Sequence, residues 1–251
     1  MNNSRPTIWF RPLGLWLAVW LAAASFGAAI DHYTNGVAAY RDGEFTASAQ
    51  AFAAAAAAQP ATGTYVNLGL AEWERGRLGH AVLAWERALW IDPDNVAAQE
   101  NLRFAREQSQ LEAPSLAWHE VASTWLPFNA WAWLAGVSLW LAVGMMTVPP
   151  WLRWRRSGWH QAVAAAGLAV FLMCVPAMLG LKSRQQLVIV LERNTPLRLT
   201  PTEDAQWVTV LSAGDPARVE RARGNYMLVR TAQGRGWLER TQVGGISGSR
   251  F

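Results

Sequence analysis

The chain has 251 residues, of which 52% are hydrophobic and 16% are charged. Soluble proteins usually carry about 25% charged residues, so this composition argues against an ordinary soluble protein and favours one that contacts a membrane. The formal net charge of +4 is unevenly distributed, because residues 31–114 carry six basic and eleven acidic side chains, whereas residues 182–251 carry eleven basic and six acidic ones. This balance does not indicate nucleic acid as a partner, and a single cysteine excludes an intrachain disulfide.

Residues 1–29 have the three parts of a secretory signal peptide. Arg5 and Arg11 precede an apolar run from Leu13 to Ala24, and small residues follow it. Twelve apolar residues make about 18 Å of helix, which is shorter than a hydrocarbon core of about 30 Å. We therefore expect a cleaved signal peptide, with an uncleaved N-terminal anchor as the alternative, and in both cases the residues that follow are exported.

Residues 31–110 contain an internal repeat with a shift of 33 residues. Seven pairs of positions match: Gly36 with Gly69, Tyr40 with Trp73, Gly43 with Gly76, Phe45 with Leu78, Phe52 with Trp85, Ala55 with Ala88 and Pro60 with Pro93. This pattern of glycine, aromatic residue, alanine and closing proline resembles the tetratricopeptide repeat, whose period is about 34 residues. The resemblance implies two helix pairs, and the residues after Pro93 predict a capping helix that begins at Asp94 or Asn95.

The resemblance to tetratricopeptide repeats also implies a concave face that is built by the first helix of each pair. The partner-binding residues expected there are Tyr40, Arg41, Trp73, Glu74, Arg103 and Arg106. The alternative for Tyr40 and Trp73 is an ordinary role in the core. Because three or more repeats are usually needed for a stable array, we expect these two repeats to depend on a partner, a second copy or a membrane-proximal helix.

Residues 115–128 show a helical apolar pattern just before the first membrane segment. Trp118, Val121, Ala122 and Trp125 follow the spacing i, i+3, i+4 and i+7. Because tryptophan collects at the boundary between membrane and water, this pattern predicts a short interfacial helix.

Two longer apolar runs, residues 130–148 and 162–181, predict transmembrane helices. They contain nineteen and twenty residues without a charge, and neither has a polar face. The loop between them, residues 149–161, carries three arginines: Arg153, Arg155 and Arg156. Because arginine-rich loops tend to stay in the cytoplasm, the sequence predicts a cytoplasmic loop, with both soluble parts on the periplasmic side of a bacterial inner membrane.

Residues 183–243 change to a period of two, with short β-branched and aromatic runs separated by turn sequences. They predict a small all-β barrel with the core residues Val208, Val210, Val219, Leu228 and Trp237. The motif formed by Tyr226, Gly236 and Trp237 resembles the end of bacterial Src-homology-3-like domains, although the string usual near the start of such domains is absent around residues 196–201. Residues 244–251 are expected to form a flexible tail.

The sequence contains few residues in patterns that support catalysis or metal binding. Its four histidines lie far apart, without the spacing of a metal site, and it contains no phosphate-binding loop. We therefore expect no enzymatic activity, no metal and no cofactor.

Together these segments predict a multidomain membrane protein: an α-helical tetratricopeptide-type module, a two-helix transmembrane hairpin and a small all-β Src-homology-3-like barrel. This order of parts resembles the BatE-like proteins of the Bacteroides aerotolerance operon type. The resemblance implies a non-enzymatic envelope protein that works beside von Willebrand factor type A proteins and a MoxR-type ATPase, in stress or oxygen tolerance.

The expected function is therefore a membrane-anchored scaffold that binds protein partners and contacts membrane lipid, with no role for nucleic acid. The alternative is a cell-wall module that recognises peptidoglycan through the C-terminal barrel. A third possibility is a hairpin that transmits a signal across the membrane.

Overall fold

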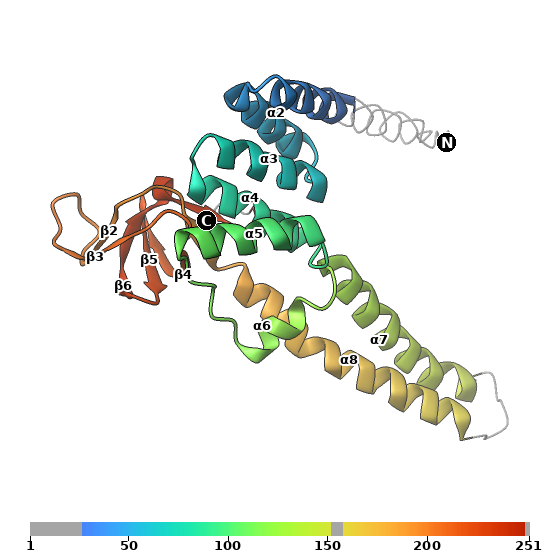
Figure 1. The fold of residues 1–251 in the computed structure, drawn as a ribbon. Helices are drawn as coiled ribbons and strands as arrows, with labels where there is room; N and C mark the ends of the chain where they lie inside the picture. The colour runs from blue at the N-terminus through green and yellow to red at the C-terminus, as the bar shows by residue number, and fades with distance from the viewer. Residues whose placement is uncertain (1–26, 152–157, 249–251) are drawn as a thin grey trace, which may run out of the picture.

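The computed structural model describes residues 27–151 and 158–248. Within them lie an array of helices, a hairpin of two long apolar helices that projects away from the array, and a separate antiparallel sheet (Figure 1). At this level the expected fold class is confirmed. The predicted signal segment up to residue 26, the loop residues Arg153, Arg155 and Arg156, and residues 249–251 lie outside the described residues.

The array consists of two helix pairs and one further helix. The first pair is the helix of residues 27–41 with α2 (Phe45–Ala58), the second is α3 (Thr62–Glu74) with α4 (Leu78–Ile91), and α5 (Val96–Ser109) follows. Residues 45 and 78, 58 and 91, and 41 and 74 are each 33 positions apart, so the helices repeat with the shift found in the sequence. Asn95 caps α5 as predicted, since its side chain accepts a hydrogen bond from the backbone N–H of Ala98 at 3.0 Å.

Each helix pair contains the same contact between a glycine and an aromatic ring. A Cβ atom added at Gly36 would lie 2.8 Å from the ring of Phe52, and one added at Gly69 would lie 2.6 Å from Cδ1 of Trp85. Both rings are almost completely buried. Because a real Cβ atom cannot come so close, glycine is required for the ring of the second helix to pack against the first helix.

The two second helices differ where α4 meets the sheet. Gln50 on α2 is exposed, whereas its equivalent on α4, Leu83, is buried. Thr46 is also exposed, but a Cβ at its equivalent, Gly79, would lie 2.5 Å from the carbonyl oxygen of Val190 in the sheet. The second repeat therefore departs from the first at the positions that the sheet covers.

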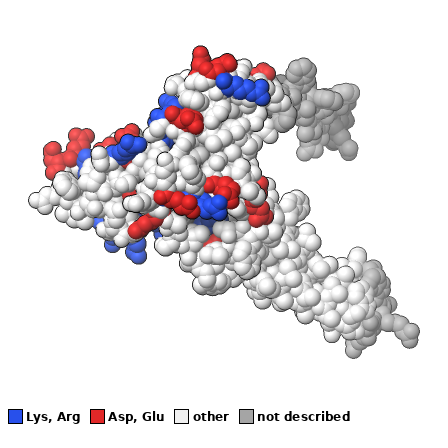
Figure 2. Space-filling model, in the orientation of Figure 1, with Lys and Arg blue, Asp and Glu red and all other residues white. Residues whose placement is uncertain are grey.

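Two long helices, α7 (Phe128–Trp151) and α8 (Trp159–Arg184), form the hairpin and contain the two apolar runs of the sequence. With 24 and 26 residues they are about 36 and 39 Å long, and both are long and apolar enough to cross a bilayer. They pack closely, because a Cβ at Gly167 would lie 2.9 Å from the carbonyl oxygen of Ser138. Figure 2 shows almost no charged side chains on the hairpin, in contrast to the array and the sheet. These features suggest association with a membrane.

The sheet has the strand order β3-β2-β6-β5-β4-β1-β7, with antiparallel pairing throughout. Its strands are β1 (Leu187–Val190), β2 (Thr195–Arg198), β3 (Trp207–Leu211), β4 (Pro216–Arg223), β5 (Tyr226–Thr231), β6 (Gly234–Glu239) and β7 (Val243–Gly245). The sheet is open, with β3 and β7 at its edges, whereas the sequence predicts a small barrel.

Strand β1 is buried on both of its faces. Val188 and Val190 belong to the core of the sheet, whereas Leu187 and Ile189 pack in a cluster that includes Val82 of α4. Because successive side chains of a strand point to opposite faces, four consecutive apolar residues allow β1 to contribute to two cores. This strand joins the sheet to the array.

Most of the core positions predicted for the sheet are wrong. Val208 and Val210 lie on the edge strand β3 and are exposed, and Leu228 and Trp237 are only half-buried. Val219 is buried as expected, and the buried apolar side chains of β5 and β6 are Met227, Val229 and Leu238. Since side-chain direction alternates along a strand, an error of one residue assigns each side chain to the opposite face.

The predicted flexible tail was also wrong for its first residues. β7 pairs with β1, and Ile246 is buried in the cluster between the sheet and the array. A short run with two glycines has little strand propensity of its own, so its structure depends on a partner strand that lies more than fifty residues away in the sequence.

A buried ion pair connects the hairpin to the sheet. Glu120 of the short helix α6 (Trp118–Ser123) is almost fully buried, and Arg218 of β4 donates hydrogen bonds to both of its carboxylate oxygens, at 2.6 and 2.9 Å. Ser183 of α8 and the backbone N–H of Ala117 donate to the same carboxylate. Burial alone would raise the pKa of Glu120, but these hydrogen bonds and the charge of Arg218 lower it to about 2. The charged carboxylate therefore links α6, α8 and β4.

The glycine contact inside the second helix pair predicts a position-specific loss of stability. Gly69→Ala forces the Trp85 ring to move, so we expect it to lower the free energy of unfolding by about 1–3 kcal/mol. Gly63→Ala, on the same helix, adds its Cβ in open space and serves as the matched control, with no loss or a small gain. Thermal unfolding of the purified full-length protein, followed by circular dichroism, measures both. Equal midpoint temperatures for the two variants would contradict the glycine contact.

The ion pair between Glu120 and Arg218 predicts a larger loss of stability than the glycine contact. Arg218→Ala leaves the Glu120 carboxylate buried without its charged partner, so we expect stability to fall by about 3 kcal/mol. Arg223→Ala is the matched control, because Arg223 lies on the same strand, is exposed and forms no ion pair among the described residues.

The pH dependence of stability provides a second test of this ion pair. A carboxyl group whose pKa falls from 4.5 to about 2 on folding stabilises the fold fully above about pH 4.5, and this stabilisation is lost as the pH falls through about 2. The difference in stability between the native protein and Arg218→Ala should therefore shrink as the pH is lowered from 4.5 towards 2. A difference that is constant over this range would show that the Glu120 charge is not its source.

Candidate functional site in the groove of the helix array

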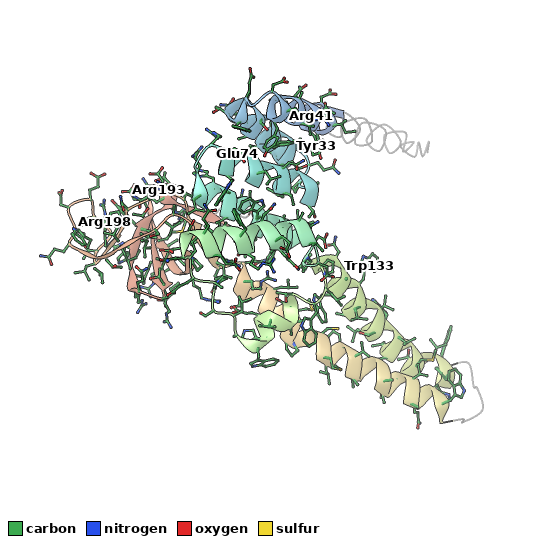
Figure 3. The ribbon with its side chains drawn as sticks, in the orientation of Figure 1. Tyr33, Arg41, Glu74, Trp133, Arg193 and Arg198 are labelled. Atoms are coloured by element: carbon green, nitrogen blue, oxygen red, sulfur yellow. The ribbon has the colours of Figure 1, made fainter. Side chains whose placement is uncertain are left out.

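A small groove opens at the N-terminal end of the array, between the first helix and α3. It encloses a cavity of about 130 Å³, and its lining comes from the first helix, α2 and α3. The lining residues are Val37, Tyr40, Arg41, Phe52, Asn67 and Leu70. Figure 3 labels Tyr33, Arg41 and Glu74 among the side chains of this upper part of the molecule.

Aromatic contacts hold the residues around the groove. The ring of Tyr33 packs edge-on against Phe52, with ring centroids 5.6 Å apart, and its hydroxyl oxygen accepts a hydrogen bond from Asn67 Nδ2 at 3.0 Å. The ring of Tyr40 packs in the same way against Phe45 at 5.4 Å. Because these contacts link the first helix to both α2 and α3, the groove is preformed rather than created by a ligand.

Charges of both signs influence the groove: Arg41 lines it, and Glu74 acts on Tyr40. Arg41 and Glu74 are exposed, and neither forms an ion pair among the described residues. Burial and the charge of Glu74 both raise the pKa of Tyr40 above its ordinary value. The Tyr40 hydroxyl therefore remains protonated at neutral pH and can act as a hydrogen-bond donor or acceptor at the edge of an apolar cavity.

The six residues expected to bind a partner are not gathered in one place. Tyr40 and Arg41 line the cavity, and Glu74 is close enough to influence Tyr40. Trp73 is half-buried and packs against the rings of Trp85 and Phe104, at 6.0 and 5.7 Å between centroids.

The two arginines of α5 are paired within the array. Arg106 forms an ion pair with Glu86 of α4, and Arg103 pairs with Glu100 and Glu107 of its own helix. Their contacts are accounted for by packing of the array, so partner binding by Arg103 and Arg106 stays a prediction.

Sequence reasoning missed Val37, Asn67 and Leu70 as lining residues. Val37 and Leu70 are 33 positions apart, so the repeat alignment could have identified them as equivalent positions on the two first helices. Asn67 has no such signal, because its role depends on Tyr33 of the neighbouring helix.

The motif residues of the sheet have mainly structural roles. Gly236 is buried, and a Cβ added there would lie 2.6 Å from Cγ of Leu197 and 2.7 Å from the carbonyl oxygen of Arg198. It therefore allows β2 to cross β6 closely. Tyr226 of β5 pairs with Glu239, and Trp237 of β6 pairs with Leu228; both motif residues are half-buried.

The two edges of the sheet differ in how they are covered. At β7, Arg87 of α4 donates a hydrogen bond to the carbonyl oxygen of Gly245 at 3.1 Å, so the array covers this edge. At the other edge, β3 exposes the side chains of Trp207, Val208 and Val210. An uncovered apolar edge strand is unusual in a protein that remains soluble, so the β3 edge is a second candidate for binding.

Within residues 27–151 and 158–248, no group of three or more histidine, cysteine, aspartate or glutamate side chains could hold a metal ion. A comparison of the chain with protein-family models, with curated proteins and with solved structures finds no match in any of the three. The function must therefore be argued from the residues of the groove, the hairpin and the sheet.

Proposed function

We propose that this protein is a non-enzymatic, membrane-anchored scaffold whose groove between the first helix and α3 binds a segment of a partner protein. The observation that supports this proposal best is the preformed apolar cavity, which Arg41 lines and whose Tyr40 feels the charge of Glu74, neither charged residue forming an ion pair among the described residues. Two helix pairs with a 33-residue repeat agree with the resemblance to tetratricopeptide repeats, which serve protein binding.

The cavity also limits the chemistry of the partner segment. A volume of about 130 Å³ accommodates one large apolar side chain, and its lining is largely apolar. Arg41 and Glu74 favour an acidic and a basic residue on either side of that anchor. The expected partner segment is therefore a short helix or extended peptide with one apolar anchor between opposite charges.

The membrane part of the proposal comes from the hairpin and from the arginine-rich loop of the sequence. Two apolar spans with Arg153, Arg155 and Arg156 between them favour a cytoplasmic loop and soluble modules on the periplasmic side. By its resemblance to BatE-like proteins, the chain would work beside von Willebrand factor type A proteins and a MoxR-type ATPase in an envelope complex for stress or oxygen tolerance.

The groove proposal predicts a specific cross-link. With a photoreactive phenylalanine analogue in place of Tyr40, the full-length protein in native membranes should form a discrete adduct with its partner. Leu70→Arg fills the cavity and places a charge in it, so the adduct should decrease at least about tenfold.

Gln50→Arg is the control, since it adds the same charge on the exposed side of α2 and outside the cavity lining. An adduct that is equally strong in Leu70→Arg and Gln50→Arg would exclude the groove as the binding site.

Peptidoglycan binding is the second candidate function, and the uncovered β3 edge favours it. Trp207 is 65% exposed, and an exposed aromatic ring on a sheet offers a surface on which a sugar ring can stack. The candidate binding residue is therefore Trp207 rather than the motif residue Trp237, which is half-buried.

Sedimentation with purified peptidoglycan tests this candidate with the full-length protein in detergent. Trp207→Ala should abolish co-sedimentation, whereas Phe104→Ala, which removes an exposed ring from the array, should leave it unchanged. If the native protein stays in the supernatant, the scaffold function alone remains.

A further inference from the structure

Helix α6 has the opposite burial pattern to a helix on the surface of a soluble protein. Its polar residues Glu120 and Ser123 are each 1% exposed, whereas its apolar residues Trp118 and Val121 are 73% and 43% exposed. Trp125, just after the helix, is 68% exposed. In water the apolar side chains of such a helix gain no burial on folding, and the buried carboxylate is tolerated only because Arg218 and its other hydrogen-bond donors compensate for its desolvation.

The exposed apolar surface continues without a break to the hairpin. Leu126 and Phe128 are also exposed, and Phe128 is the first residue of α7. A contiguous apolar surface of this kind marks a site of contact with protein or membrane. Because it merges with the outer surface of two helices that are apolar enough to cross a bilayer, lipid is the occupant that both surfaces share.

The position of α6 along the hairpin agrees with a membrane boundary. The backbone of His119 lies directly on Gly180 of α8, where an added Cβ would be 2.6 Å from the carbonyl carbon of His119. Gly180 follows Trp159 by 21 residues, which is about 31 Å of helix and close to a hydrocarbon thickness of about 30 Å. Trp159 is exposed at the other end, so aromatic residues lie at both expected boundaries.

A positively charged side chain, Lys182, follows the part of α8 on which α6 packs. Lys182, two residues after Gly180, is exposed and forms no ion pair among the described residues. At this level a lysine side chain can reach the phosphate of a lipid headgroup.

The polar face of α6, which contains Glu120, is bound to the sheet by the ion pair between Glu120 and Arg218.

We propose that α6 is a membrane-contact helix. Its apolar face, formed by Trp118, Val121 and Trp125, inserts into the lipid leaflet on the side of the soluble modules. Its polar face fixes the sheet to the hairpin through Glu120 and Arg218. The leaflet then sets the position of the sheet and, through β1, of the array. This inference rests on the proposed bilayer-spanning hairpin but not on partner binding in the groove.

The experiment uses the full-length protein with Cys174→Ala, reconstituted in nanodiscs of phosphatidylcholine and phosphatidylglycerol. An environment-sensitive fluorophore is attached at Val121→Cys and, as the matched control, at Gln50→Cys, which is exposed on the array. We expect a blue-shifted emission at residue 121, quenching by lipids that carry a nitroxide near the headgroup, and protection from iodide in the water. The control should show the reverse.

Other outcomes overturn the proposal. Quenching of the residue 121 probe by iodide, to the extent seen at residue 50, would place α6 in water. Protection from both quenchers would show that protein, such as a second copy, covers the face. If the protein does not enter nanodiscs at all, the membrane anchor itself is refuted. This outcome is distinguishable from iodide quenching and from protection against both quenchers.

A distance measurement tests the polar face. Spin labels at Val121→Cys and Arg223→Cys, the latter at the end of β4, should give a narrow distance distribution that broadens when Arg218→Ala is added. A broad distribution in the presence of Arg218, or a narrow one that Arg218→Ala leaves unchanged, would overturn the role of this ion pair as the link between α6 and the sheet.

Discussion

The arrangement of the whole molecule depends on the burial of β1 on both of its faces. Val188 and Val190 complete the core of the sheet, while Leu187 and Ile189 cover α4. Burying one aliphatic side chain stabilises a fold by roughly 1.5–3 kcal/mol, so this one strand stabilises two cores together. The array and the sheet therefore form one body, and the ion pair of Glu120 with Arg218 adds the hairpin to it. The proposed scaffold would therefore hold a bound partner in a fixed position relative to a membrane.

The contact between the sheet and α4 explains how so short an array can be stable. Two helix pairs are fewer than a repeat array usually needs, because each pair buries its apolar face only against a neighbour. Here the sheet covers α4, and the guanidinium of Arg184 from α8 lies 5.3 Å from the ring centroid of Trp90 on the same helix. The support comes from the protein's own sheet as well as from its membrane-proximal helices. The groove lies at the other end of the array, where the sheet does not cover it, and is left open.

The groove, the β3 edge and the apolar face of α6 differ in what they can bind. The groove is small, preformed and bordered by charge, which suits one anchor residue of a peptide. The β3 edge is flat and apolar and offers backbone groups as well as an exposed ring, which suits a strand or a sugar. The face of α6 is continuous with the hairpin and lies about one bilayer thickness from its far end, which suits lipid. These assignments are compatible, because the surfaces belong to different elements.

The sequence alone determined the features that depend on local patterns. The 33-residue repeat, the turn glycines Gly43 and Gly76 with their positive φ angles, and the two apolar runs all follow from spacing and composition. Tertiary structure alone decided which face of β5 and β6 is buried, the pairing of β7 with β1, the burial of Glu120 and the lining of the groove by Asn67. Each of these depends on a contact between residues that lie far apart in the chain, and such contacts are set by the packing of whole elements rather than by neighbours in sequence.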